Sequence, residues 1–253
     1  MRRRFMILVA CFLFVSFAYS FEETKSLSLS AAGLEKFEID SGSGFLKVYG
    51  REGQETIEVE AEIEVKGISE SKKKDFLRKY VELSLKKRGN RAVLVSNIDH
   101  KGWFPPFKSA VINLTVNMPK NMELDVDDGS GTIKIENIKG RIYIDDGSGT
   151  TEVTDIIGDV EIDDGSGEVN VNQVTGNVWI DDGSGTVEVN NINGDVTIDD
   201  GSGTIYIRDI EGSVTLRDGS GSINVERVKK DVIIKDDGSG SVNISNVKGK
   251  VIK

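Results

Sequence analysis

The amino-acid sequence predicts an all-β protein: a parallel β-solenoid with 18-residue turns, preceded by a β-rich segment that carries one short helix. Three observations predict this fold. The triplet Gly-Ser-Gly returns every 18 residues, apolar and polar residues alternate between the triplets, and each unit contains two similar nine-residue halves. Alternation with a period of two buries one side of a strand. Self-similarity at a fixed short period is typical of a solenoid.

The first twenty residues differ in composition from the rest of the chain. Arginines at 2–4 precede an apolar run over 5–17, and residues 18–20 (Ala-Tyr-Ser) place small side chains before Phe21. This order is typical of a secretory signal peptide. The apolar run is shorter than the roughly 20 residues that a membrane-spanning helix needs. We therefore expect residues 1–20 to be removed, so that the mature chain is exported to the periplasm, the cell surface or the medium.

The single cysteine, Cys11, leaves two alternatives open. It follows Leu-Val-Ala at 8–10, which resembles the cleavage box of bacterial lipoproteins. A lipidated Cys11, or an uncleaved apolar anchor, would then give the chain its only membrane contact. Ordinary cleavage removes this cysteine, so disulfides cannot stabilise the mature chain even in an oxidising compartment.

Charge and reactive residues exclude several classes of function. The chain has 42 acidic and 32 basic residues, which argues against nucleic acid as a partner because phosphate binding needs clustered positive charge. It has one histidine, so the mature chain lacks the parts of a nucleophile–base pair or a zinc cluster. We expect no catalytic residue and no cofactor, with calcium as the one alternative considered below.

Residues 21–120 are expected to form a β-rich segment that covers one end of the rod, since an uncapped solenoid exposes an open strand edge. The expected elements are an outlying solenoid turn over 36–50, a strand over 55–65, a helix over 69–80, a hairpin over 81–95 and a strand over 109–119. Ser69 or Ser71 is the expected helix N-cap. Gly89-Asn90 is the expected hairpin turn.

One loop in this segment, Asp99–Lys108, departs from the surrounding alternation. It holds the only histidine, His100, close to three aromatic residues, Trp103, Phe104 and Phe107. A loop folded over the rod end explains these residues. The alternative is an exposed apolar tip, in which case Trp103, Phe104 and Phe107 are candidate contacts for a partner.

Residues 121–253 are expected to form about seven solenoid turns. The Gly-Ser-Gly triplets begin at Gly129, Gly147, Gly165, Gly183, Gly201, Gly219 and Gly238. The two halves of a unit end in different corners, so stacking like on like requires a full unit per turn, with parallel strands about 4.8 Å apart along the rod. Parallel crossovers favour a right-handed coil.

Two aspartates precede most of the triplets, and the alternation separates their roles. Since Val196 and Ile198 point inward, we expect Asp199 to point outward and Asp200 to enter the corner. An aspartate there can accept hydrogen bonds from backbone N–H groups two residues on, while glycine permits positive φ. The predicted structural corner residues are Asp128, Asp146, Asp164, Asp182, Asp200 and Asp218.

The outward positions form a second series: Asp127, Asp145, Asp163, Asp181 and Asp199, followed by Arg217 and Lys235. Stacked carboxylates repel one another, so screening by solvent or a bound cation must relieve them. These five aspartates are therefore weak candidates for a calcium ladder. They do not form an EF-hand, because the first and twelfth ligand positions would fall on Val126 and Asn137.

The chain resembles a known family in the order of its motifs. A "FEIDSGSG" turn, a strand-helix-hairpin insert and the run "INLTVNMPKNMELDVDDGSGTIKIENIKGRIYI" follow one another. This order is similar to that of the bacterial putative-adhesin domain family of unknown function, whose members resemble β-solenoids. The resemblance implies a role at the surface or in the envelope and supplies no catalytic residues.

These observations together predict a non-catalytic, exported structural or adhesin-like protein with an envelope or surface partner, protein or glycan. One alternative is a calcium-dependent structural module built on the outward aspartates. A second is a carbohydrate-active β-helix enzyme, which would place its acids on one sheet face.

Overall fold

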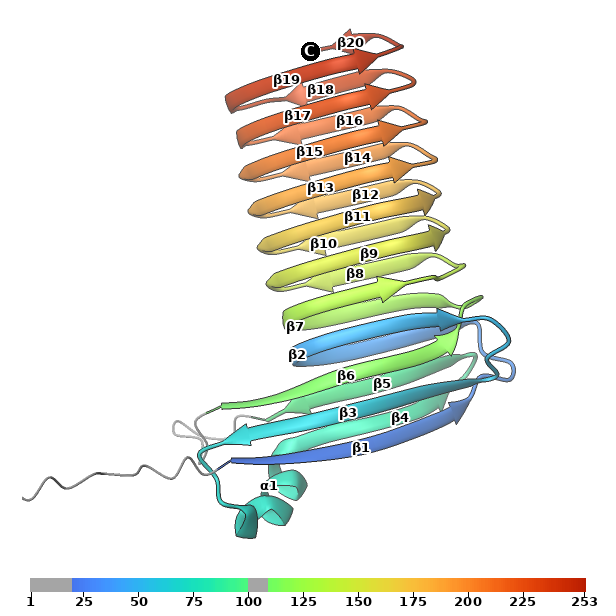
Figure 1. Cartoon of the computed structure of the whole chain (residues 1–253), viewed down its shortest axis with the longest axis vertical. Coiled ribbons are helices and arrows are strands. Elements are labelled where there is room, and N and C mark those ends of the chain that lie inside the picture. Colours follow the sequence, from blue (N-terminus) through green and yellow to red (C-terminus); the bar gives the residue numbers. More distant parts are fainter. Residues whose placement is uncertain (1–19, 100–108) are drawn as a thin grey trace, which may run out of the picture.

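The computed structural model describes residues 20–99 and 109–253, and its strands coil into a single rod (Figure 1). From β7 (Glu123–Glu136) to β20 (Val251–Ile252), strands on the near side run one way and strands on the far side return, so this part of the chain climbs as a right-handed coil. The predicted fold class, a parallel β-solenoid with a β-rich segment and one short helix, is confirmed.

Each solenoid turn contains one short and one long strand. The short strands are β8 (Ile142–Asp146), β10 (Val160–Asp164), β12 (Val178–Asp182), β14 (Val196–Asp200), β16 (Val214–Asp218), β18 (Val232–Asp236) and β20 (Val251–Ile252). The long strands are β9 (Gly149–Ile157), β11 (Gly167–Thr175), β13 (Gly185–Ile192), β15 (Gly203–Ile210), β17 (Ser220–Val228) and β19 (Ser239–Val247). β7 (Glu123–Glu136) covers both halves of its own turn.

Like residues stack on like residues along the rod. Ile180 pairs in parallel with Ile162 in the turn before it and with Ile198 in the turn after it. The register shifts once, where β16 meets β18 and Arg217 lies opposite Asp236. The repeat pattern predicts Lys235 opposite Arg217, and this prediction is wrong, because the extra residue in the last repeat is absorbed as a bulge before the corner.

The outlying turn predicted over 36–50 is confirmed. β2 (Lys36–Arg51) pairs in parallel with β7 along both halves of the turn. The other edge of β2 pairs with β5 (Arg91–Ile98) along its first half and with β6 (Ser109–Pro119) along its second half. The insert between β2 and β7 therefore extends the two faces of the rod rather than forming a separate body.

Two faces result. On the short-strand face, β4 (Val81–Arg88) lies antiparallel to β5 and forms the edge. On the long-strand face, β3 (Thr56–Lys66) lies antiparallel to β6, and β1 (Ser20–Ser30) lies antiparallel to β3 as the edge. The hairpin turn falls at Gly89-Asn90, as predicted, since Arg88 lies opposite Arg91.

The predicted helix lies at the end of the rod, as the 3₁₀ turn η1 (Glu70–Lys72) followed by α1 (Lys73–Tyr80). Ser69 precedes it but makes no capping hydrogen bond with its side chain. Phe76 anchors the helix: it is buried, with ring centroids 5.6 Å from Phe21 and 5.4 Å from Tyr80. No helix in the described ranges is long and apolar enough to cross a membrane.

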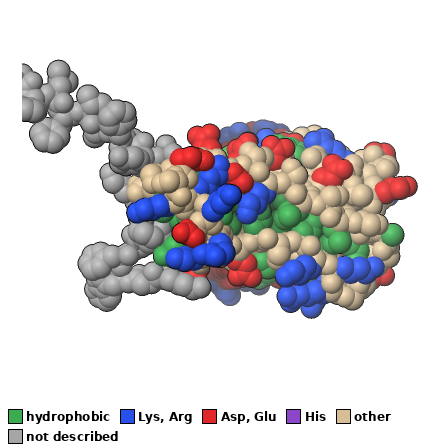
Figure 2. Space-filling model, turned by 90° about the horizontal axis from the view of Figure 1, so that it is seen from below, with side chains coloured by type: hydrophobic (Ala, Val, Ile, Leu, Met, Phe, Trp, Pro, Cys, Tyr) green, Lys and Arg blue, Asp and Glu red, His purple; other side chains and the backbone are tan. Residues whose placement is uncertain are grey.

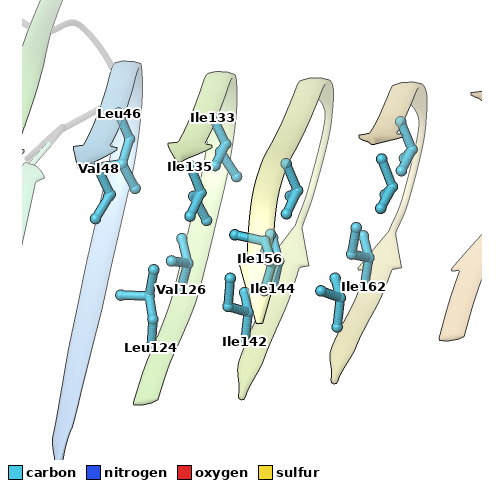
Figure 3. Packing of buried hydrophobic residues seen from close by; sticks show 14 of the residues in the cluster. Leu46, Val48, Leu124, Val126, Ile133, Ile135, Ile142, Ile144, Ile156 and Ile162 are labelled. Carbon is cyan, nitrogen blue, oxygen red and sulfur yellow. The ribbon is translucent and has the colours of Figure 1, made fainter. Parts of the chain in front are cut away.

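The core is a set of apolar columns that run along the rod. Figure 3 shows pairs such as Leu124 with Val126 and Ile142 with Ile144 repeated from turn to turn. These side chains are essentially inaccessible to solvent. Burial of apolar surface contributes roughly 25 cal/mol per Å², so each added turn stabilises its neighbours.

Candidate functional site in the stacked corners

The second aspartate of each corner points into the rod. Asp182 is the last residue of β12, two positions after Ile180, and is 1% exposed. Its Oδ1 accepts a 3.1 Å hydrogen bond from the backbone N–H of Ser184, which is the geometry of an Asx-turn. The same bond joins Ser148 to Asp146, Ser166 to Asp164, Ser202 to Asp200 and Ser220 to Asp218. How much these bonds stabilise the fold stays a prediction.

The second carboxylate oxygen is left without a partner in most turns. Within the described ranges, no hydrogen bond reaches Oδ2 of Asp128, Asp164, Asp182, Asp200 or Asp218. Asp146 differs, because Thr151 Oγ1 donates a 3.0 Å hydrogen bond to its Oδ2. Buried polar atoms without partners are rare and costly in folded proteins. These six residues, named here the buried aspartate column, are therefore the most unusual feature of the core.

Burial changes the acidity of this column. Burial first, and the carboxylates in adjacent turns second, raise the pKa of Asp128, Asp164, Asp182 and Asp200 to about 6. Burial also raises the pKa of Asp146, although the hydrogen bond from Thr151 opposes this change. The column therefore takes up protons as the pH falls from neutral toward 5.

Glycine is required where the corners stack. Gly185 has φ of +146°, and a Cβ atom on it would lie 1.8 Å from the carbonyl oxygen of Gly167 in the preceding turn. The backbone of Gly185 also donates a 3.0 Å hydrogen bond to Ser202 O in the following turn. The backbones are thus in direct contact along the rod, and any side chain at this position would separate the turns.

The first aspartates of the corners form the outer aspartate ladder: Asp40, Asp127, Asp145, Asp163, Asp181 and Asp199. They point away from the core, and Arg217 ends the ladder with an ion pair of 2.8 Å to Asp199. Partial burial and neighbouring carboxylates raise the pKa of Asp127 and Asp181. In the part of the chain that the structure describes, no three His, Cys, Asp or Glu residues are grouped to hold a metal ion. Calcium binding here stays a prediction.

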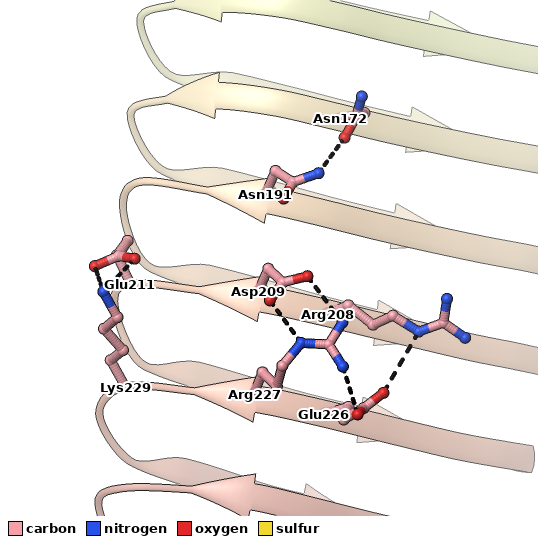
Figure 4. A network of polar contacts seen from close by, with 8 residues as sticks. All are labelled: Asn172, Asn191, Arg208, Asp209, Glu211, Glu226, Arg227 and Lys229. Carbon is pink, nitrogen blue, oxygen red and sulfur yellow. Dashed lines mark hydrogen bonds and ion pairs between the residues drawn. The ribbon is translucent and has the colours of Figure 1, made fainter.

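The other corner of each turn contains a feature that the sequence pattern did not predict. One residue per turn adopts the left-handed conformation, with φ between 56° and 60°: Asn137, Asp155, Gln173, Asn191, Asp209, Arg227 and Asn246. Arg227 donates two hydrogen bonds, of 2.7 and 2.9 Å, to Asp209 one turn away (Figure 4). Asparagine and aspartate tolerate this conformation, so their 18-residue recurrence was a usable signal, although Gln173 and Arg227 obscured it.

The remaining candidates lie elsewhere. Trp103, Phe104 and Phe107, the predicted partner contacts, lie outside the described residues, as does Cys11. Two other aromatic residues are exposed on the shaft of the rod: Trp179 on the short-strand face and Tyr206 on the long-strand face, each 37% exposed.

The chain is similar to several solved structures and matches one family model. The chain is similar to a putative adhesin from Bacteroides fragilis (13% identity, TM-score 0.46, covering 90% of this chain and 96% of that one). It is also similar to a putative adhesin from Parabacteroides distasonis, with 15% identity and a TM-score of 0.39 over 90% of this chain and 96% of that one. A putative cell adhesion protein from Clostridium sporogenes is similar as well, with 11% identity and a TM-score of 0.32 over 91% of this chain and 99% of that one. A search of curated proteins finds no match. The model of the family described as Toastrack DUF4097 matches residues 51–253, and the chain therefore belongs to that family.

Proposed function

We propose that this protein is an exported, non-catalytic rod of the bacterial envelope or cell surface, which holds its two β faces out to a protein or glycan partner. The apolar segment over 5–17 and the small residues before Phe21 support export. The names of the similar solved structures, putative adhesins and a putative cell adhesion protein, agree with a surface role.

The observation that carries the proposal is the separation of the paired aspartates. In each corner one carboxylate, such as Asp182, is enclosed in the rod, while its neighbour Asp181 lies on a sheet face in a row of like charges. General acid and base groups must reach the same substrate atoms. The two aspartates of each corner lie on opposite sides of the backbone, one inside the rod and one on its surface. This arrangement suits the stacking of turns better than it suits catalysis.

A second candidate function is a cation-dependent structural module. The outer aspartate ladder favours it, because carboxylates stacked at strand spacing create a local negative potential that attracts divalent ions. In this case the cation would stiffen the rod rather than take part in chemistry. Calcium melting experiments, described in the Discussion, separate this role from simple screening.

Fractionation of cells that express the full chain tests the proposal. We expect the protein outside the cytoplasm, with a new N-terminus at Phe21 found by mass spectrometry. Leu13→Arg, which interrupts the apolar run, should retain the chain in the cytoplasm. A lipid-modified Cys11 would redirect the proposal to a lipoprotein, and a wild-type chain that stays cytoplasmic with Met1 intact would contradict export.

The partner is then sought with the exported form. Immobilised mature protein should retain envelope proteins or glycans, and Trp103, Phe104 and Phe107 changed together to serine should weaken this retention without unfolding the rod. Loss of the fold in that variant would assign the three aromatic residues to the core or cap. A hydrolase or lyase activity abolished by one aspartate substitution would overturn the non-catalytic assignment.

A further inference from the structure

The end of the rod formed by β1, β4 and α1, here called the cap end, exposes an apolar seam. Edge strands β1 and β4 face one another there, and their inward side chains are covered on one side only. The seam residues are half-buried and pack against the core: Leu27, Leu29, Val81, Leu83 and Leu85. Figure 2 views this end directly and shows hydrophobic side chains at its centre, with Lys and Arg side chains and some Asp and Glu side chains around them.

The cap end is basic, whereas the shaft is acidic. Residues 20–30 and 70–88 contain nine Lys and Arg against five Asp and Glu, while residues 121–253 contain 12 against 27. Several of these basic side chains are exposed on the helix and on β4: Lys72, Lys74, Arg78, Lys79, Lys86 and Arg88. The chain thus separates charge along the rod, with its positive part around the apolar seam.

The edge strands argue against another β-strand as the partner of this seam. On β1, Glu23 and Lys25 lie opposite Ile63 and Ala61 and so face the interior side of the sheet. Lys73 Nζ holds Glu23 with an ion pair of 2.7 Å. Inward-facing charges on an edge strand oppose the addition of a further strand. The partner that covers this seam must therefore bind apolar and cationic side chains without adding a strand to the sheet.

We propose that the cap end docks on an anionic lipid surface and that the rod stands away from it. Apolar side chains seated at the headgroup boundary, with basic residues around them, are the features that bind interfacial elements to membranes. Each Lys or Arg near an anionic surface contributes about 1 kcal/mol of attraction. The acidic shaft is repelled by the same surface, so the rod is oriented upright. This inference gives the proposed exported rod a site of membrane attachment. It rests on the proposed function in one respect only, because export decides which membrane the cap end meets.

Vesicle binding by the mature protein, beginning at Phe21, tests the proposal. This chain retains every strand of the rod and lacks only Ser20, the first residue of β1. We expect co-sedimentation with vesicles of phosphatidylcholine and phosphatidylglycerol, little with phosphatidylcholine alone, and weakening by salt. The triple variant K72E/K74E/K79E should lose at least about tenfold in affinity. The matched control K235E/K248E/K250E changes the net charge equally at the far end and should bind like the wild type.

A label reports which end makes contact. The mature chain has no cysteine, so Lys86→Cys and Lys250→Cys each accept one environment-sensitive dye, and only the dye at position 86 should shift to the blue on binding. Thermal unfolding of every variant by circular dichroism confirms the fold. No binding to anionic vesicles, equal loss in both triple variants, or a blue shift at position 250 would each overturn the proposal. None of these results bears on export, which fractionation tests separately.

Discussion

Thr151 Oγ1 donates a 3.0 Å hydrogen bond to Oδ2 of Asp146 inside the rod. The same oxygen is without a partner in the other five members of the buried aspartate column, in the described part of the chain. Thr151 lies in register with Val169 and, one turn further, with Val187. A hydroxyl at this one position thus satisfies an acceptor that valine leaves exposed to the apolar core.

This relationship predicts opposite effects for one substitution at two neighbouring sites. Val187→Thr places a hydroxyl beside Asp182, so we expect the free energy of unfolding at pH 7 to stay level or rise by up to about 1 kcal/mol. Val189→Thr buries the same hydroxyl two residues further along β13, away from the column, and should cost about 1–3 kcal/mol. Urea unfolding measures both. Equal losses would mean that Oδ2 of Asp182 has another partner.

The buried column predicts that the protein is more stable at pH 5 than at pH 7. Four of its carboxyls have a folded pKa of about 6, above the 3.8 of the free side chain. The folded state therefore binds more protons, and stability is fully present below about pH 4 and lost as the pH rises through 6. Between pH 7 and pH 5 the pH falls about one unit below the folded pKa of each carboxyl, which corresponds to about 1.4 kcal/mol, so four such carboxyls together would change the free energy of unfolding by roughly 5 kcal/mol. Urea unfolding at the two pH values measures this change.

Asp182→Asn isolates the contribution of one member of the column. It retains an oxygen that accepts from Ser184 but carries no charge at any pH, so the variant should gain about 1–3 kcal/mol over the wild type at pH 8 and little at pH 5. Asp181→Asn, the neighbouring residue on the outer ladder, is the control and should change this pH slope much less. Urea unfolding from pH 5 to 8 makes the comparison, and parallel curves for Asp182→Asn and wild type would contradict it.

Glycine stacking predicts a large position-dependent cost for an added methyl group. Gly185→Ala places a Cβ against the carbonyl of Gly167 at a distance of 1.8 Å, so the turns must separate, and we expect a loss of more than about 3 kcal/mol or no folding. Gly53 also has positive φ, at +67°, but has open space around it. Gly53→Ala should therefore cost only about 1 kcal/mol. Thermal unfolding ranks the two, and similar costs would refute direct backbone stacking.

The outer aspartate ladder predicts a specific response to divalent ions. Calcium should raise the melting temperature more than sodium chloride at equal ionic strength, because a divalent ion can neutralise two stacked carboxylates at once. Asp163→Asn, in the middle of the ladder, should reduce this difference, whereas Asp209→Asn at the other corner should not. Equal shifts of the melting temperature in both salts would show that ions act on the ladder only by ordinary screening.

The helix and hairpin show how far local signals reach. The spacing of Phe76 and Tyr80 predicted the helix, and Gly89-Asn90 predicted the turn, since both depend on residues close together in the chain. The expected cap by Ser69 or Ser71 is wrong, because η1 begins the helix and the two serine hydroxyls lie near each other instead of capping it. A serine hydroxyl at the start of a helix can bond a backbone N–H group or a neighbouring side chain. These alternatives differ little in free energy, so the sequence does not decide between them.

The sequence by itself determined the solenoid. An 18-residue period with two unlike corners allows each residue to meet only its counterpart one turn away, so columns such as Ile162, Ile180 and Ile198 follow from spacing alone. Only the tertiary structure decided that Asp182 lies inside the core, that Gln173 adopts positive φ, and that β5 and β6 pair with β2. The first two depend on where the backbone bends relative to the strand above it. The third joins residues distant in the chain, and such contacts are fixed only when the whole rod closes over its core.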